Sequence, residues 1–293
     1  MHRIDGPGAT VDNKFTDGDP VGGIQPTVVT DEWMNDVQEN IMAVLVAAGV
    51  SPTKGRAADL LDSLKKVPTG RLINIRLFTA SGTYTPTSGT NSIVVEVCGG
   101  GGGGGGGSNS NTPSPGFAST GTGGSAGASA KGMFTSAFTG LPITVGAGGS
   151  GGISTGLGAN GSNGGSSSLG GLISAGGGAG GPGGIVISSF PTASSEQSSV
   201  AVGVGGTIYN GAGAIGDKGT LYAANNLSTG KGASSAFGAG GYSKALAAGA
   251  GQQAGANATG FGAGGGGAGS VTGGNNTTGG NGASGFVIIW EYS

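Results

Sequence analysis

The sequence contains few of the residues on which most protein chemistry depends. Only 9% of its 293 residues are charged, aromatic residues make up 5%, and there are one cysteine and one histidine. With 12 Lys and Arg against 14 Asp and Glu, it has no surplus of positive charge with which to bind nucleic acid, and we exclude that class of partner. One cysteine excludes an internal disulfide, and Cys98, which follows a valine-rich run, is expected to be a small buried hydrophobe.

Long hydrophobic runs are also missing. No apolar stretch approaches the ~18 residues that a membrane-spanning helix needs, and residues 1–7 lack the apolar centre of a signal peptide. The sequence therefore predicts a soluble product of the cytoplasm in which it is made.

The shortage of histidine and acids argues against an enzyme. Residues 123–127 and 148–152 match the G-x-S-x-G nucleophile motif, but that motif needs a histidine base between a strand and a helix, and the only histidine is His2. After Cys98, Glu196 and Asp217 are the one pair of acids outside the closing strand that would fit two-carboxylate glycoside cleavage. Both are better explained as solvated loop residues. With no Cys/His cluster either, we expect no catalytic residue, no metal site and no cofactor.

Glycine is the residue in excess: 63 of the 73 glycines come after Cys98. Ordering one residue costs about 1–2 kcal/mol of backbone entropy, and glycine lies at the upper end. Such a segment either stays disordered or packs backbone against backbone, as glycine permits in collagen. Aliphatic islands at residues 141–145, 184–187 and 200–204 favour packing, whereas no strict Gly-X-Y triplet is kept. We therefore expect packed polyglycine II helices rather than a collagen triple helix.

Residues 30–67 are expected to be helical. Thr30 supplies a capping hydroxyl ahead of two acids, Gly49 is a suitable stop, and a second, shorter helix is expected to open at Ser51. Because two such helices bury little by themselves, we expect their apolar stripes to pack on other copies of the chain. The alternative is a self-contained hairpin that packs on later strands. The expected oligomerisation residues are Trp33, Val37, Ile41, Val44, Leu45, Leu60, Leu61 and Leu64.

From residue 71 the pattern changes to that of strands, at residues 72–78 and 92–97. Nine glycines follow Cys98 directly, and the apolar residues 286–292 close the chain, so we expect the glycine region to be one long excursion between two strands of a sheet. The fold class is thus mixed: a small helical segment, short β-strands, and a glycine-rich domain closed by a C-terminal strand. The expected parts are an extended N-terminal arm (1–29), a helical oligomerisation segment (30–67), a β-region (68–98, completed by 286–293) and a glycine-rich domain (99–285).

Candidate binding residues lie in polar segments between the glycine runs. Tyrosine offers contact area at low entropic cost, and asparagine offers adaptable hydrogen bonds, although asparagine is also favoured in plain turns. The candidates for contact with a binding partner are Tyr209, Asn210, Tyr222, Asn225, Asn226, Asn109, Asn111, Asn275 and Asn276, with the stretch from 209 to 226 ranked first.

Six stretches together point to one family. Residues 2–5, 15–18 and 33–49 in the first part of the chain, and 143–149, 232–238 and 286–292 in the second, resemble in order the tail fibre proteins of tailed bacteriophages and related prophages that end in a glycine-rich domain. No single motif is specific, but the combination covers most of the chain.

The resemblance implies a homotrimeric fibre of the virion, with an N-terminal part that attaches to a tail or baseplate protein and a distal part that touches the host. In glycine-rich phage adhesins the glycine helices stack, and variable loops at one end contact the receptor. The implied receptor is a lipopolysaccharide, an outer-membrane protein or a pilus. Because the chain has no extended shaft, we expect a short fibre or a tail tip. A structural tail or spacer protein and a capsule depolymerase are the alternatives.

Overall fold

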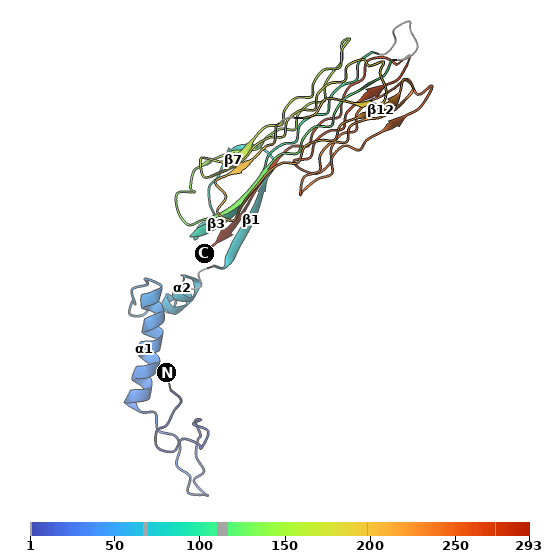
Figure 1. Cartoon of the computed structure of the whole chain (residues 1–293). Helices are drawn as coiled ribbons and strands as arrows, with labels where there is room; N and C mark the ends of the chain where they lie inside the picture. The colour runs from blue at the N-terminus through green and yellow to red at the C-terminus, as the bar shows by residue number, and fades with distance from the viewer. Residues whose placement is uncertain (1, 67–69, 110–116, 198, 273) are drawn as a thin grey trace. The chain divides into compact units, whose positions relative to one another are not determined.

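A computed structural model describes residues 2–66, 70–109, 117–197, 199–272 and 274–293. The chain divides into two compact units, residues 1–71 together with Ser293, and residues 72–292 (Figure 1). Each unit is described by itself.

The first unit contains α1 (Asp31–Ala47) and α2 (Asp59–Lys66), which contact each other. Thr30 caps α1 as predicted, since its hydroxyl accepts a hydrogen bond from the amide of Trp33 at 3.3 Å. The predicted start of the second helix at Ser51 is wrong. Residues 51–58 form turns, with Gly55 at a φ of 86°, and α2 begins only where the Asp59 carboxylate accepts the amide of Thr53 at 2.7 Å.

The apolar stripes of the two helices differ in burial. Leu45 is buried, while Asp59 and Ser63 take the buried face of α2. Of the other expected oligomerisation residues, Trp33, Val37 and Val44 are half-buried, and Ile41, Leu60, Leu61 and Leu64 are exposed. The helical segment thus presents leucines that the described residues of its own unit leave exposed.

Residues 2–29 double back on themselves and do not form the single extended arm that was predicted. The amide of Val28 donates to the carbonyl of Pro7 at 2.8 Å, and Asp19 and Ile24 form a β-bridge. The Ile4 side chain is buried. Backbone pairing within the segment, which the Gly- and Pro-rich sequence did not reveal, accounts for the difference.

Two five-stranded antiparallel sheets form one end of the second unit. The larger has the order β1-β17-β3-β5-β11 (Leu72–Phe78, Phe286–Tyr292, Ser92–Cys98, Ser129–Phe134, Tyr209–Gly211), and the smaller has the order β10-β8-β7-β6-β2 (Gly203–Val204, Ile173–Ala175, Ser167–Leu169, Pro142–Thr144, Gly82–Thr83). Val95, Val97 and Ile289 of the larger sheet share a core with Ile143 and Leu169 of the smaller. The closing strand β17 joins the sheet of the two earlier strands, as the sequence predicted, and the structure places it between β1 and β3.

Beyond these sheets, the glycine-rich segments are joined by backbone hydrogen bonds that repeat every three residues. The amides of residues 99–107 donate in turn to residues 122–128, 159–165 and 277–283, at N···O distances of 2.8–3.0 Å. The carbonyls of residues 100–106 accept from residues 149–152, 178–184 and 265–268 at 2.8–2.9 Å. The nine-glycine run is thus surrounded by six other segments.

This central position explains why the run has no other residue type. A Cβ added to Gly104 would lie 2.0 Å from the carbonyl oxygen of Gly266, and one added to Gly103 would lie 2.0 Å from that of Ser150. Both are far inside van der Waals contact. Each of the three directions around the run faces another backbone, so a side chain fits at none of them. We call this array of hydrogen-bonded segments the glycine lattice.

Two small sheets lie at the opposite end of the glycine lattice (Figure 1). Their strand orders are β14-β13-β12-β9 (Ala245–Leu246, Asn226–Ser228, Thr220–Ala223, Thr192–Ala193) and β15-β16-β4 (Gln252–Gln253, Gly269–Ser270, Ser119–Thr120). A second, smaller core of Ala118, Leu221, Leu227, Leu246 and Val271 supports them.

Candidate functional site

Six chain reversals meet at the end of the glycine lattice that lies away from the two five-stranded sheets. We call this the loop end and define it by its described residues: 107–109, 153–158, 185–191, 222–226, 247–251, 271–272 and 274–277. Hydrogen bonds join reversals that are far apart in sequence: the amide of Asn109 donates to the carbonyl of Gly156 at 3.2 Å, and the hydroxyl of Thr272 donates to the carbonyl of Ala224 at 3.3 Å. The loops therefore form one surface.

A hairpin of β12 and β13 contributes the most prominent side chains of the loop end. Leu221 and Leu227 are register partners and are fully buried in the small core beneath the hairpin. Strand alternation then turns Tyr222 outward, where its side chain is 55% exposed. Asn225 and Asn226 are exposed at the turn of the same hairpin.

The other predicted asparagines of the glycine region come to the same surface. Asn109 and Asn275 are exposed, and Asn276 is half-buried. The backbone amide of Asn275 donates to the side-chain oxygen of Gln252 at 3.0 Å, which ties this reversal to the start of β15. Asn111 lies outside the described residues. The structure thus gathers candidates that are more than 160 residues apart in sequence, because the glycine lattice returns each segment to the same end.

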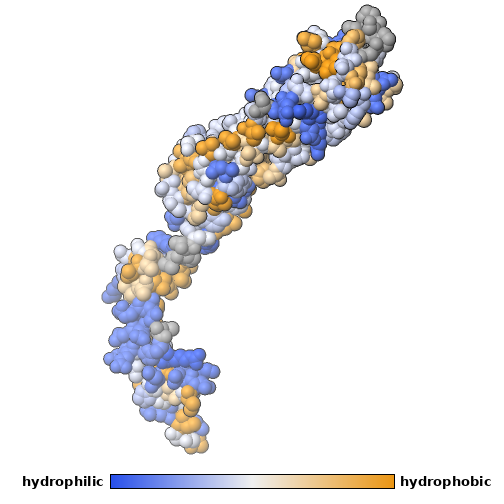
Figure 2. Space-filling model, in the orientation of Figure 1, coloured by the Kyte–Doolittle hydropathy of each residue, from blue (hydrophilic) through white to orange (hydrophobic). Residues whose placement is uncertain are grey.

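The loop end is uncharged. None of its described residues is Asp, Glu, Lys, Arg or His, and residues 110–116 add no charged residue by sequence. Its exposed side chains include the aliphatic Ile153 and Leu157, 67% and 70% exposed, and Ile185. Figure 2 shows hydrophobic surface at this end of the unit. Such a surface offers van der Waals contact and neutral hydrogen bonds, without ion pairs.

Tyr209 and Asn210 lie elsewhere, although they belong to the stretch ranked first. They are part of β11, which pairs with β5 in the larger sheet. The Tyr209 hydroxyl donates to Glu96 at 2.7 Å, and its pKa is raised to about 12, first by burial and then by this bond. The side-chain oxygen of Asn210 accepts a hydrogen bond from the backbone amide of Gly206 at 2.8 Å, and its side-chain nitrogen donates to the carbonyl of Gly206 at 2.9 Å. The structure does not bring this pair to the loop end.

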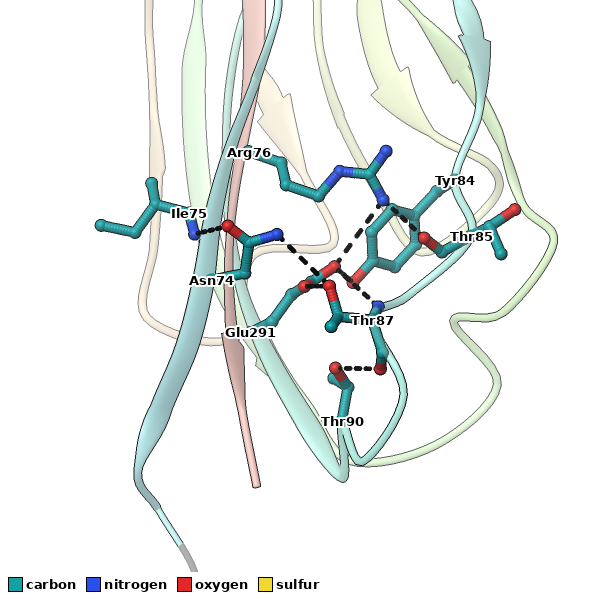
Figure 3. A network of polar contacts seen from close by, with 8 residues as sticks. All are labelled: Asn74, Ile75, Arg76, Tyr84, Thr85, Thr87, Thr90 and Glu291. Atoms are coloured by element: carbon teal, nitrogen blue, oxygen red, sulfur yellow. Dashed lines mark hydrogen bonds and ion pairs between the residues drawn. The ribbon is translucent and has the colours of Figure 1, made fainter.

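A buried carboxylate, which the sequence reasoning left unassigned, holds the closing strand (Figure 3). Glu291 is fully buried and accepts hydrogen bonds from the Tyr84 hydroxyl at 2.8 Å and the Thr87 hydroxyl at 2.5 Å. The Arg76 guanidinium lies 3.9 Å away. Burial, followed by the bond to Glu291, raises the pKa of Tyr84. The buried position of Glu291 does have a signal in the sequence: Val287, Ile289 and Glu291 alternate along the strand, which places the acid on the buried face.

The residues considered for catalysis lie in ordinary surface or core positions. Glu196 is exposed and forms an ion pair with Lys218 at 2.8 Å, and Asp217 is exposed. Cys98 is buried as predicted, and its pKa is raised to about 12 by burial and then by the charge of Glu96. Within the described residues, no three His, Cys, Asp or Glu side chains are grouped to hold a metal ion, and no helix is long and apolar enough to cross a membrane.

Comparison with known proteins assigns the second unit. Residues 79–292 match the family model described as a glycine-rich domain, and the chain therefore belongs to the glycine-rich domain family. The chain is also similar to the uncharacterized protein StfP of Escherichia coli (strain K12), with 38% identity over 71 residues. That stretch is 22% of this chain and 34% of StfP, so the chain covers about a third of the length of this relative.

Proposed function

We propose that this chain is a tail fibre or tail tip protein of a bacteriophage or phage-derived particle, and that it binds a receptor on the bacterial surface through the loop end. The observation that carries the proposal is the meeting of six reversals at one end of a rigid backbone array. Membership of the glycine-rich domain family and the resemblance of the first part of the chain to phage tail fibres support it. On this proposal the protein is located in the virion.

We further infer that the segments of the glycine lattice are polyglycine II helices. The three-residue interval of their hydrogen bonds is the interval of a three-fold extended helix, in which successive residues point in directions about 120° apart. Such a scaffold is ordered before contact is made. Less conformational entropy is then lost on binding, which favours affinity from a small surface.

The fibre is proposed to be a homotrimer that attaches through residues 1–71 to a tail or baseplate protein. The exposed leucines of α2 and the half-buried stripe of α1 support contact between copies in this region. Three loop ends per fibre and several fibres per particle multiply weak contacts, because linking binding sites raises the apparent affinity without new chemistry.

The proposed mechanism is adhesion without catalysis. Glu196, one of the two acids considered for glycoside cleavage, is engaged in an ion pair with Lys218, which does not favour a depolymerase. A receptor-blind spacer protein is the stronger rival. Because the described loop end has no charge, its binding should change little with salt, unlike that of a surface that relies on exposed ion pairs.

The test is binding of the purified chain to intact cells of the bacterium that the particle infects. Tyr222→Ala combined with Asn225→Ala should weaken binding at least tenfold, since a buried aromatic contact with its hydrogen bonds contributes about 1.4 kcal/mol or more. The matched control is Tyr242→Ala, because Tyr242 is 64% exposed but lies outside the loop end.

Exchange of residues 99–285 between related particles should transfer host range. If host range stays with the remainder of the particle, the adhesin proposal fails, and if purified protein does not bind the host, the spacer alternative stands. Release of reducing sugar from host polysaccharide, lost in Glu196→Gln, would establish the depolymerase instead.

A further inference from the structure

The outer face of the larger five-stranded sheet is apolar, and the described part of its own chain leaves much of it open. The inner face packs on the smaller sheet. On the outer face, Ile75 and Leu77 of β1 are exposed, Leu77 by 54%, and Met133 of β5 is 49% exposed. Register partners carry this pattern across the sheet: Leu77 with Ile288, Ile75 with Trp290, and Trp290 with Val94.

A shallow groove of about 350 Å³ runs along this face. Phe286 forms its floor and is held in place by edge-to-face contacts with Phe237 and Phe261, at centroid distances of 4.9 and 5.2 Å. The apolar residues that line the groove are Leu77, Phe237, Phe261, Phe286, Ile288 and Trp290.

The polar groups that the sheet adds to this face satisfy one another. Lys131 donates to Glu96 at 3.1 Å and lies over the ring of Trp290 at 4.7 Å, while the Tyr209 hydroxyl donates to the other oxygen of Glu96 at 2.7 Å. The face therefore has zero net charge, and its charged and hydroxyl groups already form hydrogen bonds with one another. A small polar ligand would need convergent free groups, and a charged partner would need an unpaired charge.

The adjacent edge of the sheet is less suited to a partner than the face. The amide of Ile75, in the edge strand β1, is taken by the side-chain oxygen of Asn74 at 2.9 Å, and the Asn74 amide donates to Thr87 at 3.3 Å. A side chain that occupies an edge amide discourages strand addition. Packing of flat surfaces is thus favoured over extension of the sheet.

We propose that this outer face is a contact surface between copies of the chain. A further copy presents the same neutral, apolar surface, so the faces of neighbouring copies meet without like-charge repulsion and without stranding a buried charge. Five strands at ~4.8 Å spacing and three side-chain rows give the face an area on the order of 400 Å². That is at the size where exposed apolar patches mark interfaces, and about half of the ~800 Å² that a stable partner surface buries.

The proposal does not rest on receptor binding, and its test uses no host cell. In a full-length Trp33→Phe variant, Trp290 is the only tryptophan, so acrylamide quenching reports whether this face is covered. Because Trp33 is itself an expected oligomerisation residue, the mass of this parent is first matched to that of the unaltered chain. Sedimentation equilibrium reports the mass. The parent should be oligomeric at micromolar concentration, with Trp290 poorly quenched.

Leu77→Glu places a charge on the β1 side of the face, next to its register partner Ile288, and should weaken self-association at least tenfold. It should also raise the quenching of Trp290 toward the value for an exposed ring. Val204→Glu is the matched control, because Val204 is a strand residue with 58% exposure in the smaller sheet. It should change neither measurement. Met133→Glu, on the other side of the face, serves if Leu77→Glu does not fold.

An assembly held together elsewhere, for example by α1 and α2, would keep its mass in Leu77→Glu, but Trp290 would still become accessible, which supports the proposal. A parent protein whose Trp290 is already freely quenched would overturn it. Unchanged mass and unchanged quenching in both folded Glu variants would overturn it as well. Neither of these results would bear on the adhesin proposal, which is tested separately with variants of the loop end.

Discussion

Replacing one lattice glycine by alanine should destabilise the second unit out of proportion to the size of a methyl group. At Gly104 the new Cβ would lie 2.0 Å from the carbonyl oxygen of Gly266, so a neighbouring segment must move. The amide of Gly104 donates to Gly280 at 2.8 Å, and its carbonyl accepts from Gly152 at 2.9 Å. Overpacking costs about 2 kcal/mol, and each weakened hydrogen bond about 1 kcal/mol.

The lower entropy of the unfolded alanine chain returns up to about 1 kcal/mol, which leaves a net loss of about 3 kcal/mol. For a unit of this size, 1 kcal/mol shifts the midpoint by about 2–4 °C, so Tm should fall by roughly 6–12 °C in differential scanning calorimetry. Gly171→Ala is the control, because nothing lies within 4 Å of a Cβ there and its φ is not positive. It should keep or slightly raise Tm. Equal midpoints for the two variants would refute the packed-backbone account.

Two further predictions concern polar contacts. Glu291→Gln should destabilise the second unit by about 3 kcal/mol in urea unfolding, because it disrupts a buried, hydrogen-bonded carboxylate; Glu196→Gln, at an exposed ion pair, should cost less than ~1 kcal/mol, and equal losses would contradict the assignment. The hydrogen bond from the ring of His2 to Asp36 at 2.7 Å raises the pKa of His2 and lowers that of Asp36. The contact should therefore hold between the two pKa values, weaken above the raised histidine pKa and weaken again below the lowered aspartate pKa. An NMR titration of this single histidine should give a raised pKa that falls in Asp36→Asn, while the neighbouring Asp5 at 3.3 Å still raises it in part. An unchanged pKa in that variant would show the contact with Asp36 to be absent.

Features written locally in the sequence were predictable. Thr30 and the stripe after it specify α1, and the alternation at residues 72–78 and 286–292 specifies two strands of one sheet. The start of α2 was misplaced because it depends on the carboxylate of Asp59 reaching back to Thr53, a contact that periodicity does not encode.

The grouping of the candidate residues was not readable from local pattern. Tyr222 and Asn275 share the loop end because the glycine lattice carries both segments to the same side, and the order of its segments in space is a property of the fold. Tyr209 looked equivalent to Tyr222 in sequence, since both tyrosines are followed within a few residues by asparagine. Pairing of β11 with β5 places it in a sheet, and only the partner strand distinguishes the two.

The three-residue interval of the backbone bonds also limits how the genes of such proteins can change length. Inserting a single codon into one segment, or leg, of the glycine lattice would rotate the rest of that segment by about a third of a turn. The side chains of the rotated residues would then point into neighbouring backbones. Insertions and deletions in the legs should therefore survive in steps of three codons, taken in matched pairs on the outgoing and returning legs. The reversals between legs obey no such rule, so they are free to vary by any number of residues.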